Sequence, residues 1–111
     1  MHGHEFYVLG SGSGTFNPST TLKYTNPVKR DTATLPGGGW LVLAFQANNP
    51  GAWLMHCHVA FHVSEGFGVQ FLERSSEILG AIGDLSGFNS GCTDWVNYEN
   101  ANPILQIDSG L

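Results

Sequence analysis

The stretch from His56 to Phe67 constrains the fold of this chain more than any other segment. Within it, Cys57 lies between His56 and His58, and a third histidine, His62, follows four residues after His58. In an extended strand, successive side chains point to opposite faces. The sequence therefore predicts a β-strand that carries His56 and His58 on one face and Cys57 on the other.

The donor atoms of this stretch favour copper. A thiolate and imidazoles in a trigonal arrangement, with a weak or absent axial ligand, are typical of an electron-transfer copper site. Cys57 supplies the thiolate and His62 one imidazole, and a metal centre on the histidine face would be joined to this copper by the backbone of adjacent residues. Phe67 stands ten residues after Cys57, where an axial Met could be, and a phenyl ring cannot coordinate a metal. Because weak axial donation disfavours the cupric state, we expect a high reduction potential.

Two other interpretations of these residues have to be weighed. Zinc is bound by Cys and His in many structural sites, but those sites usually pair their ligands across a turn, whereas three candidate ligands alternate here. An isolated His is usually a surface or core residue. Three His and one Cys within the seven residues 56–62 form a far more specific pattern. Copper is therefore the favoured metal.

A second His-rich stretch opens the chain and reads Met1-His2-Gly3-His4-Glu5-Phe6. It resembles the multicopper oxidase motif His-Pro-x-His-Leu-His-Gly-His-x-Phe, and residues 56–67 resemble that family's last copper-binding motif, His-Cys-His-x-x-x-His-x-x-x-Gly-Phe. Within the family, the chain is most similar to the ascomycete-type laccases, over essentially its whole length. The further segments that carry this resemblance are Arg30-Asp31-Thr32, Pro36-Gly37-Gly38-Gly39-Trp40, Asn49-Pro50-Gly51-Ala52-Trp53, Phe71-Leu72-Glu73-Arg74 and Asp108-Ser109-Gly110-Leu111.

The resemblance implies a metal ligand role for five residues. His2, His56 and His58 match ligands of the paired type 3 coppers. Cys57 and His62 match ligands of the type 1 copper, where His62 is also the expected entry point for electrons.

Two further positions of the same motifs are expected not to coordinate metal. His4 falls on a family position that is not usually a ligand, so we expect a structural role close to the site. Phe67 matches the non-coordinating axial position, where ascomycete laccases more often have Leu. A Phe at this position is the pattern of relatives with higher potentials, which agrees with the argument from axial donation.

The resemblance implies the laccase reaction. Phenols or aromatic amines would be oxidised one electron at a time at the type 1 copper, and dioxygen would be reduced to water at a trinuclear cluster of type 2 and paired type 3 coppers. One alternative is another multicopper oxidase, acting on ascorbate or on metal ions. The other is a single-domain cupredoxin that carries electrons without catalysis, but such a carrier has no use for His56 and His58 beside the thiolate.

The resemblance also implies that the chain is one part of a longer enzyme. Residues 1–111 would be its C-terminal, third cupredoxin domain, truncated at the start, with residues 99–111 as the C-terminal tail. Two histidines of the family's motif would precede His2, and two further motifs belong to a domain that this sequence lacks. The isolated chain is therefore expected to be inactive, and the N-terminal domains of the same polypeptide are its expected partners.

Several residues other than the expected ligands have more than one interpretation. Cys92 resembles a laccase cysteine that forms a disulfide with the first domain, which agrees with secretion, whereas the alternative is a buried unpaired thiol. Leu111 resembles the end of a tail that plugs the solvent channel to the trinuclear cluster, whereas the alternative is an ordinary frayed terminus. Phe61 is a candidate wall of the phenol pocket or an ordinary core residue. Asp31 and Glu65 are candidates for hydrogen bonding or proton handling, or are solvated charges.

The pattern along the chain predicts an all-β fold of the cupredoxin-like Greek-key β-sandwich class, with short helices and an extended C-terminal tail. The many glycines and few charges favour a turn-rich β structure. The expected elements are strands at about 4–9, 28–35, 40–47, 52–57 and 67–73, a Gly/Ser/Thr loop at 11–20, a helical turn at 59–65, a short helix at 75–82, irregular chain after 84 and an extended last dozen residues.

Composition excludes two classes of partner. The net charge of −5 provides no basic patch, so nucleic acid is not an expected ligand. No apolar run approaches the roughly 20 residues that a membrane-spanning helix needs.

Overall fold

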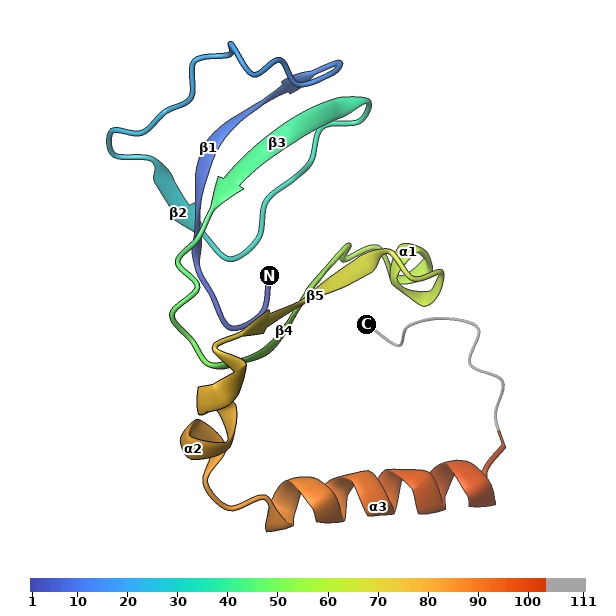
Figure 1. Ribbon diagram of the computed structural model, residues 1–111. Coiled ribbons are helices and arrows are strands. Elements are labelled where there is room, and N and C mark those ends of the chain that lie inside the picture. Colours follow the sequence, from blue (N-terminus) through green and yellow to red (C-terminus); the bar gives the residue numbers. More distant parts are fainter. Residues whose placement is uncertain (104–111) are drawn as a thin grey trace. The chain divides into compact units, whose positions relative to one another are not determined.

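The computed structural model describes residues 1–103 of the 111-residue chain. Backbone contacts divide the chain into two compact units, Met1–Asn49 and Pro50–Leu111, each with its own small sheet (Figure 1). The assignment of residues 1–111 to one cupredoxin domain stays a prediction. None of the helices within residues 1–103 is both long enough and apolar enough to cross a bilayer.

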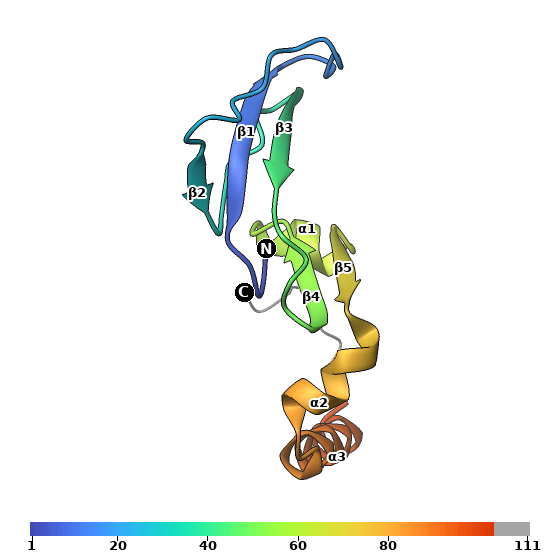
Figure 2. The ribbon, with the colours of Figure 1, turned by 60° about the vertical axis from the view of Figure 1, so that its left-hand side comes forward.

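The first unit is a three-stranded antiparallel sheet in the order β2-β1-β3. Its strands are β1 (Phe6–Ser13), β2 (Val28–Arg30) and β3 (Gly39–Ala44). Figure 2 shows β1 between the other two strands. Glycines in β1 make room for the indole of β3, because a Cβ added at Gly12 would lie 2.8 Å from the ring of Trp40. The Trp40 ring also packs edge-on against Phe16, with ring centroids 5.1 Å apart.

The second unit begins with an antiparallel pair whose connection carries the His-rich stretch. Its elements are β4 (Gly51–His56), α1 (Ala60–Ser64), β5 (Gly68–Glu73), the 3₁₀ helix η1 (Ser75–Glu77), α2 (Ile78–Ile82) and α3 (Ser86–Ala101). The pairing register places His56 opposite Gly68, at the end of the sheet next to α1. The pairing of β4 with β5 therefore fixes the position at which the chain leaves the sheet and begins the His-rich connection.

The strands appear near where the sequence predicts them, with shifted ends. The prediction of one strand that carries His56, Cys57 and His58 is wrong beyond His56, because β4 ends there. The second is shorter than expected, Val28–Arg30 instead of 28–35, and the first runs on to Ser13. The prediction of a loop from residue 11 is therefore wrong for residues 11–13, because they pair with β3. The helical turn at 59–65 and the short helix at 75–82 are confirmed by α1 and by η1 with α2.

The prediction of irregular chain after residue 84 is wrong, because Ser86–Ala101 forms the 16-residue helix α3. The same helix contains the first residues of the expected tail, 99–101. The rest of that prediction, including the tail end at Leu111, lies outside the described residues.

Candidate metal centre

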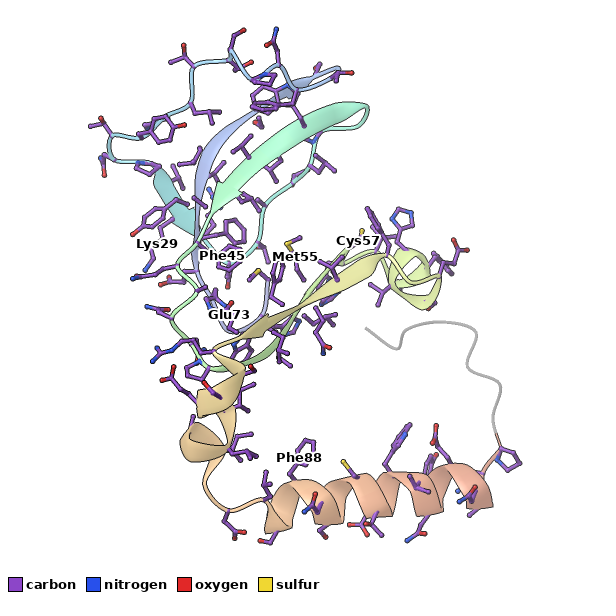
Figure 3. The ribbon with its side chains drawn as sticks, in the orientation of Figure 1. Lys29, Phe45, Met55, Cys57, Glu73 and Phe88 are labelled. Atoms are coloured by element: carbon purple, nitrogen blue, oxygen red, sulfur yellow. The ribbon has the colours of Figure 1, made fainter. Side chains whose placement is uncertain are left out.

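The centre of the site is a contact between a thiol and an imidazole. Cys57 follows β4 directly, at the end that leads toward α1 (Figure 3). Helix α1 brings His62 back, so that the Cys57 sulfur lies 3.3 Å from Nδ1 of His62. Cys57 is half-buried and His62 is exposed. Two residues that are five apart in sequence thus direct a soft and a borderline donor atom toward the same region.

The two neighbours of Cys57 form a second pair. The rings of His56 and His58 stack with centroids 5.9 Å apart and an interplanar angle of 28°. Nδ1 of His56 lies 3.0 Å from the carbonyl oxygen of Cys57. In the tautomer with a proton on Nδ1, His56 donates to this carbonyl, which leaves the Nε2 lone pair for a metal. The rings of His56 and His58 thus lie side by side, whereas the sulfur of Cys57, between them in sequence, contacts the imidazole of His62.

Phe67 lies next to the thiol and imidazole pair. Its ring meets that of His62 edge-on, with centroids 6.0 Å apart, and 60% of its side chain is exposed. A shallow pocket of about 360 Å³ is lined by His62, Glu65, Gly66 and Phe67. Phe61, expected to be a wall of the substrate pocket or a core residue, is 68% exposed and does not line this pocket. Glu65, one of the two acidic candidates, does line it.

The other candidates lie apart from this cluster in the sequence. His2 is exposed and His4 half-buried in the first unit, where the His4 ring packs at 5.3 Å from that of Phe45. Nδ1 of His4 lies 3.2 Å from the backbone oxygen of His2, which fits a structural role. The carboxylate of Asp31 accepts a hydrogen bond from Thr32. Cys92 is exposed on α3 and is not bonded to Cys57.

Gly66, the remaining residue that lines the pocket, is not among the candidate site residues that the sequence predicts. It has a φ of +90° and directly follows the last turn of α1. A glycine just after a helical pattern is a known stop signal, so its position was visible in the sequence.

The donor set fits copper. The observed 3.3 Å between the two donor atoms is close to the roughly 3.5 Å that separates a sulfur and a nitrogen ligand of one tetrahedral zinc ion, so Cys57 and His62 can share one metal ion. No third His, Cys, Asp or Glu side chain of residues 1–103 joins Cys57 and His62 in a group that could hold an ion. A trigonal copper site needs one more imidazole. A thiol and imidazole pair on a β-scaffold, flanked by two further imidazoles, supplies part of the donor set that the electron-transfer class of copper proteins uses.

Comparison with known proteins agrees with this class. The family model for multicopper oxidases matches residues 1–77. Laccase-1 of Botryotinia fuckeliana is 49% identical over an alignment of 113 residues that covers 100% of this chain and 20% of the relative. Laccase-1 of Melanocarpus albomyces is 46% identical over an alignment of 125 residues that again covers 100% of this chain and 20% of the relative. The crystal structure of a laccase from Botrytis aclada superposes with a TM-score of 0.81 at 37% identity, covering 99% of this chain and 21% of that one.

The chain therefore belongs to the multicopper oxidase family. It spans about a fifth of the length of the curated relatives that it matches. The predicted all-β, cupredoxin-like fold class is confirmed by the laccase neighbour, and the family confirms copper as the cofactor.

Proposed function

We propose that this chain is part of a laccase, which couples one-electron oxidation of phenols or aromatic amines to four-electron reduction of dioxygen to water. The observation that carries the proposal is the 3.3 Å contact between Cys57 Sγ and His62 Nδ1, with His56 and His58 on the residues that flank the thiol. The full-length laccase relatives support the reaction class.

In this proposal, copper supplies one-electron redox chemistry when it is bound. Cys57 and His62 would hold the type 1 ion, and His2, His56 and His58 would each provide an imidazole to the type 3 pair. The peptide units between Cys57 and its two neighbours provide an unbroken covalent path from the thiol to both flanking imidazoles. A single-domain electron carrier would not require that path.

The exposed edge of His62 would receive the substrate. Its pocket combines an aromatic wall, the ring of Phe67, with one carboxylate, that of Glu65. An aromatic ring can stack in such a pocket, and a carboxylate accepts a hydrogen bond from a phenol or an amine. The proposed substrates are therefore phenols and aromatic amines, with other domains of the full-length protein as the partners that complete the site.

Secretion is part of the same proposal. Cys92 is exposed and is not bonded to the other cysteine of the chain, so its sulfur is available to a cysteine elsewhere in the full-length protein. A disulfide there would require an oxidising compartment.

Oxidation of a phenolic dye by the full-length protein, followed together with oxygen uptake, tests the function. We expect one dioxygen to be consumed for every four electrons removed. Cys57→Ser should lower dye oxidation by more than about a thousandfold, as expected for a group that acts directly in the chemistry. His2→Ala should abolish oxygen uptake, whereas the matched variant His4→Ala should keep it.

The same assay separates the alternatives. Oxidation of ascorbate or of metal ions with no reaction on phenols would favour another multicopper oxidase. Copper loading that gives a thiolate absorption band without any oxygen uptake would favour an electron carrier. A loss in His4→Ala together with full activity in His2→Ala would overturn the ligand assignment.

A further inference from the structure

Helix α1 ends in a complete Schellman motif built around Gly66. With Glu65 as the C-cap residue, the backbone N–H of Gly66 donates to the carbonyl of Val63 over 2.9 Å. The N–H of Phe67 donates to the carbonyl of His62 over 2.8 Å. These are the two hydrogen bonds that define the motif, and the left-handed residue that it requires is Gly66, with φ at +90°.

This motif connects the backbones of His62 and Phe67, and through Phe67 that of Cys57. It ties Phe67 to His62 through the backbone, and the side chains of the same two residues supply the apolar contact that usually accompanies a Schellman motif. The carbonyl of Phe67 then accepts a hydrogen bond of 3.1 Å from the N–H of Cys57. One helix end thus fixes the backbone of both proposed type 1 ligands and of the residue at the axial position.

From this geometry we infer that Gly66 is a positioning residue of the copper site. Its left-handed conformation holds His62 Nδ1 at its distance from Cys57 Sγ and holds the Phe67 ring beside His62. A residue that resists positive φ would loosen both hydrogen bonds of the motif, and the thiol, imidazole and phenyl groups would shift relative to one another. The inference rests on the proposed role of Cys57 and His62 as copper ligands.

Gly83 offers a matched control. It follows another five-residue helix, α2, also has a positive φ (+72°), and donates from its N–H to Leu79. A Cβ added at Gly66 or at Gly83 would meet no atom of the described residues within 4 Å. Alanine at either position therefore strains a backbone with positive φ without a steric clash. The strain is not smaller at Gly83, whose ψ of −108° lies outside the left-handed region, but only Gly66 adjoins the site.

The experiment compares Gly66→Ala, Gly66→Asn and Gly83→Ala in the full-length, copper-loaded protein. Its readouts are the visible thiolate-to-copper charge-transfer band, the copper hyperfine splitting by electron paramagnetic resonance, and the reduction potential. We expect Gly66→Ala to shift all three and Gly83→Ala to leave them as in the parent protein. Gly66→Asn should lie between the two, because Asn tolerates the left-handed region better than Ala.

Each other outcome is informative. Spectra and potential of Gly66→Ala that match those of Gly83→Ala would overturn the inference, as would equal shifts in both alanine variants. If Gly66→Ala does not fold, Gly66→Asn takes its place in the comparison. Spectra and potential that shift in Gly66→Asn but not in Gly83→Ala would support the inference, and values that match in the two variants would overturn it. A parent protein that shows no charge-transfer band at all would refute the copper site itself, and with it the proposed function.

Discussion

At the scale of single residues, His62 has two different neighbours. Its Nδ1 lies near the Cys57 sulfur, and its ring edge meets Phe67, which cannot coordinate a metal. A donor at position 67 would stabilise the cupric state, and a phenyl ring does not. A change of the side chain at position 67 is therefore expected to alter the potential of the proposed site without removing a proposed ligand.

We predict that Phe67→Met lowers the reduction potential of the full-length, copper-loaded protein, because Met supplies a thioether donor at a position where Phe67 supplies none. Potentiometric titration of the visible band measures the change. Phe88→Met is the control, since Phe88 lies on α3 with a similar exposed fraction, 65% against 60%. An unchanged potential in Phe67→Met would contradict the axial assignment.

The sequence alone predicts much of this site, because alternation and short spacing are local. Cys57 and His62 are five residues apart, and one helical turn between them is enough to bring them together. The stop signal at Gly66 was visible in the sequence, but its link to the site was missed, because that link is made by backbone hydrogen bonds to Val63 and His62. The relation of His2 to His56 and His58 stays a prediction.

At the scale of elements, α3 shows where sequence reasoning failed. The segment contains glycines, asparagines and serines, all poor helix formers, so propensity favoured irregular chain. The missed signals are the 3–4 spacing of Phe88, Cys92 and Trp95 and an acidic residue before the first turn. That residue is Asp84, whose carboxylate accepts hydrogen bonds from the Ser86 hydroxyl at 2.7 Å and from its N–H at 2.9 Å.

We predict that Asp84→Ala destabilises the start of α3 in a pH-dependent way. Hydrogen bonds from the Ser86 hydroxyl and then from its backbone N–H lower the pKa of Asp84 below 3.8. Because the pKa of Asp84 is lower in the folded state than in the unfolded state, its ionised carboxylate stabilises the helix at pH values above the unfolded-state pKa. This stabilisation is lost as the pH falls through the folded-state pKa. The difference in Tm between parent and variant should therefore be present at about pH 7 and vanish in strong acid.

Thermal unfolding of the full-length protein across this range measures the effect. Asp94→Ala, which removes an exposed carboxylate from the middle of α3, is the control. A Tm difference for Asp84→Ala that is the same at every pH would contradict the assignment to the ionised carboxylate.

At the scale of the whole molecule, the chain buries little apolar surface by itself. Phe6 is the one buried hydrophobic side chain among residues 1–103, whereas large side chains such as Tyr24, Leu72 and Phe88 are mostly exposed. Exposed apolar surface of this kind is normally covered by a partner or another domain. A chain that covers a fifth of its relatives' length is expected to find that cover in the rest of the full-length protein.

We predict that residues 1–111, produced alone and loaded with copper, oxidise no phenolic dye, because the proposed type 1 and type 3 sites lack ligands. The same sample should bind a hydrophobic fluorescent dye and elute as oligomers on size exclusion, because its apolar side chains remain exposed. The full-length protein is the control for both measurements. Turnover by the isolated chain at the full-length rate would contradict this expectation.

The alternation at the end of β4 makes the site tolerant of one kind of genetic change and intolerant of another. A single insertion or deletion within β4 would invert the parity of the strand and move His56 out of its pairing with Gly68. Point replacements along β4 leave that parity untouched. The protein should therefore tolerate a change of length better in a surface loop such as residues 14–27 than within β4.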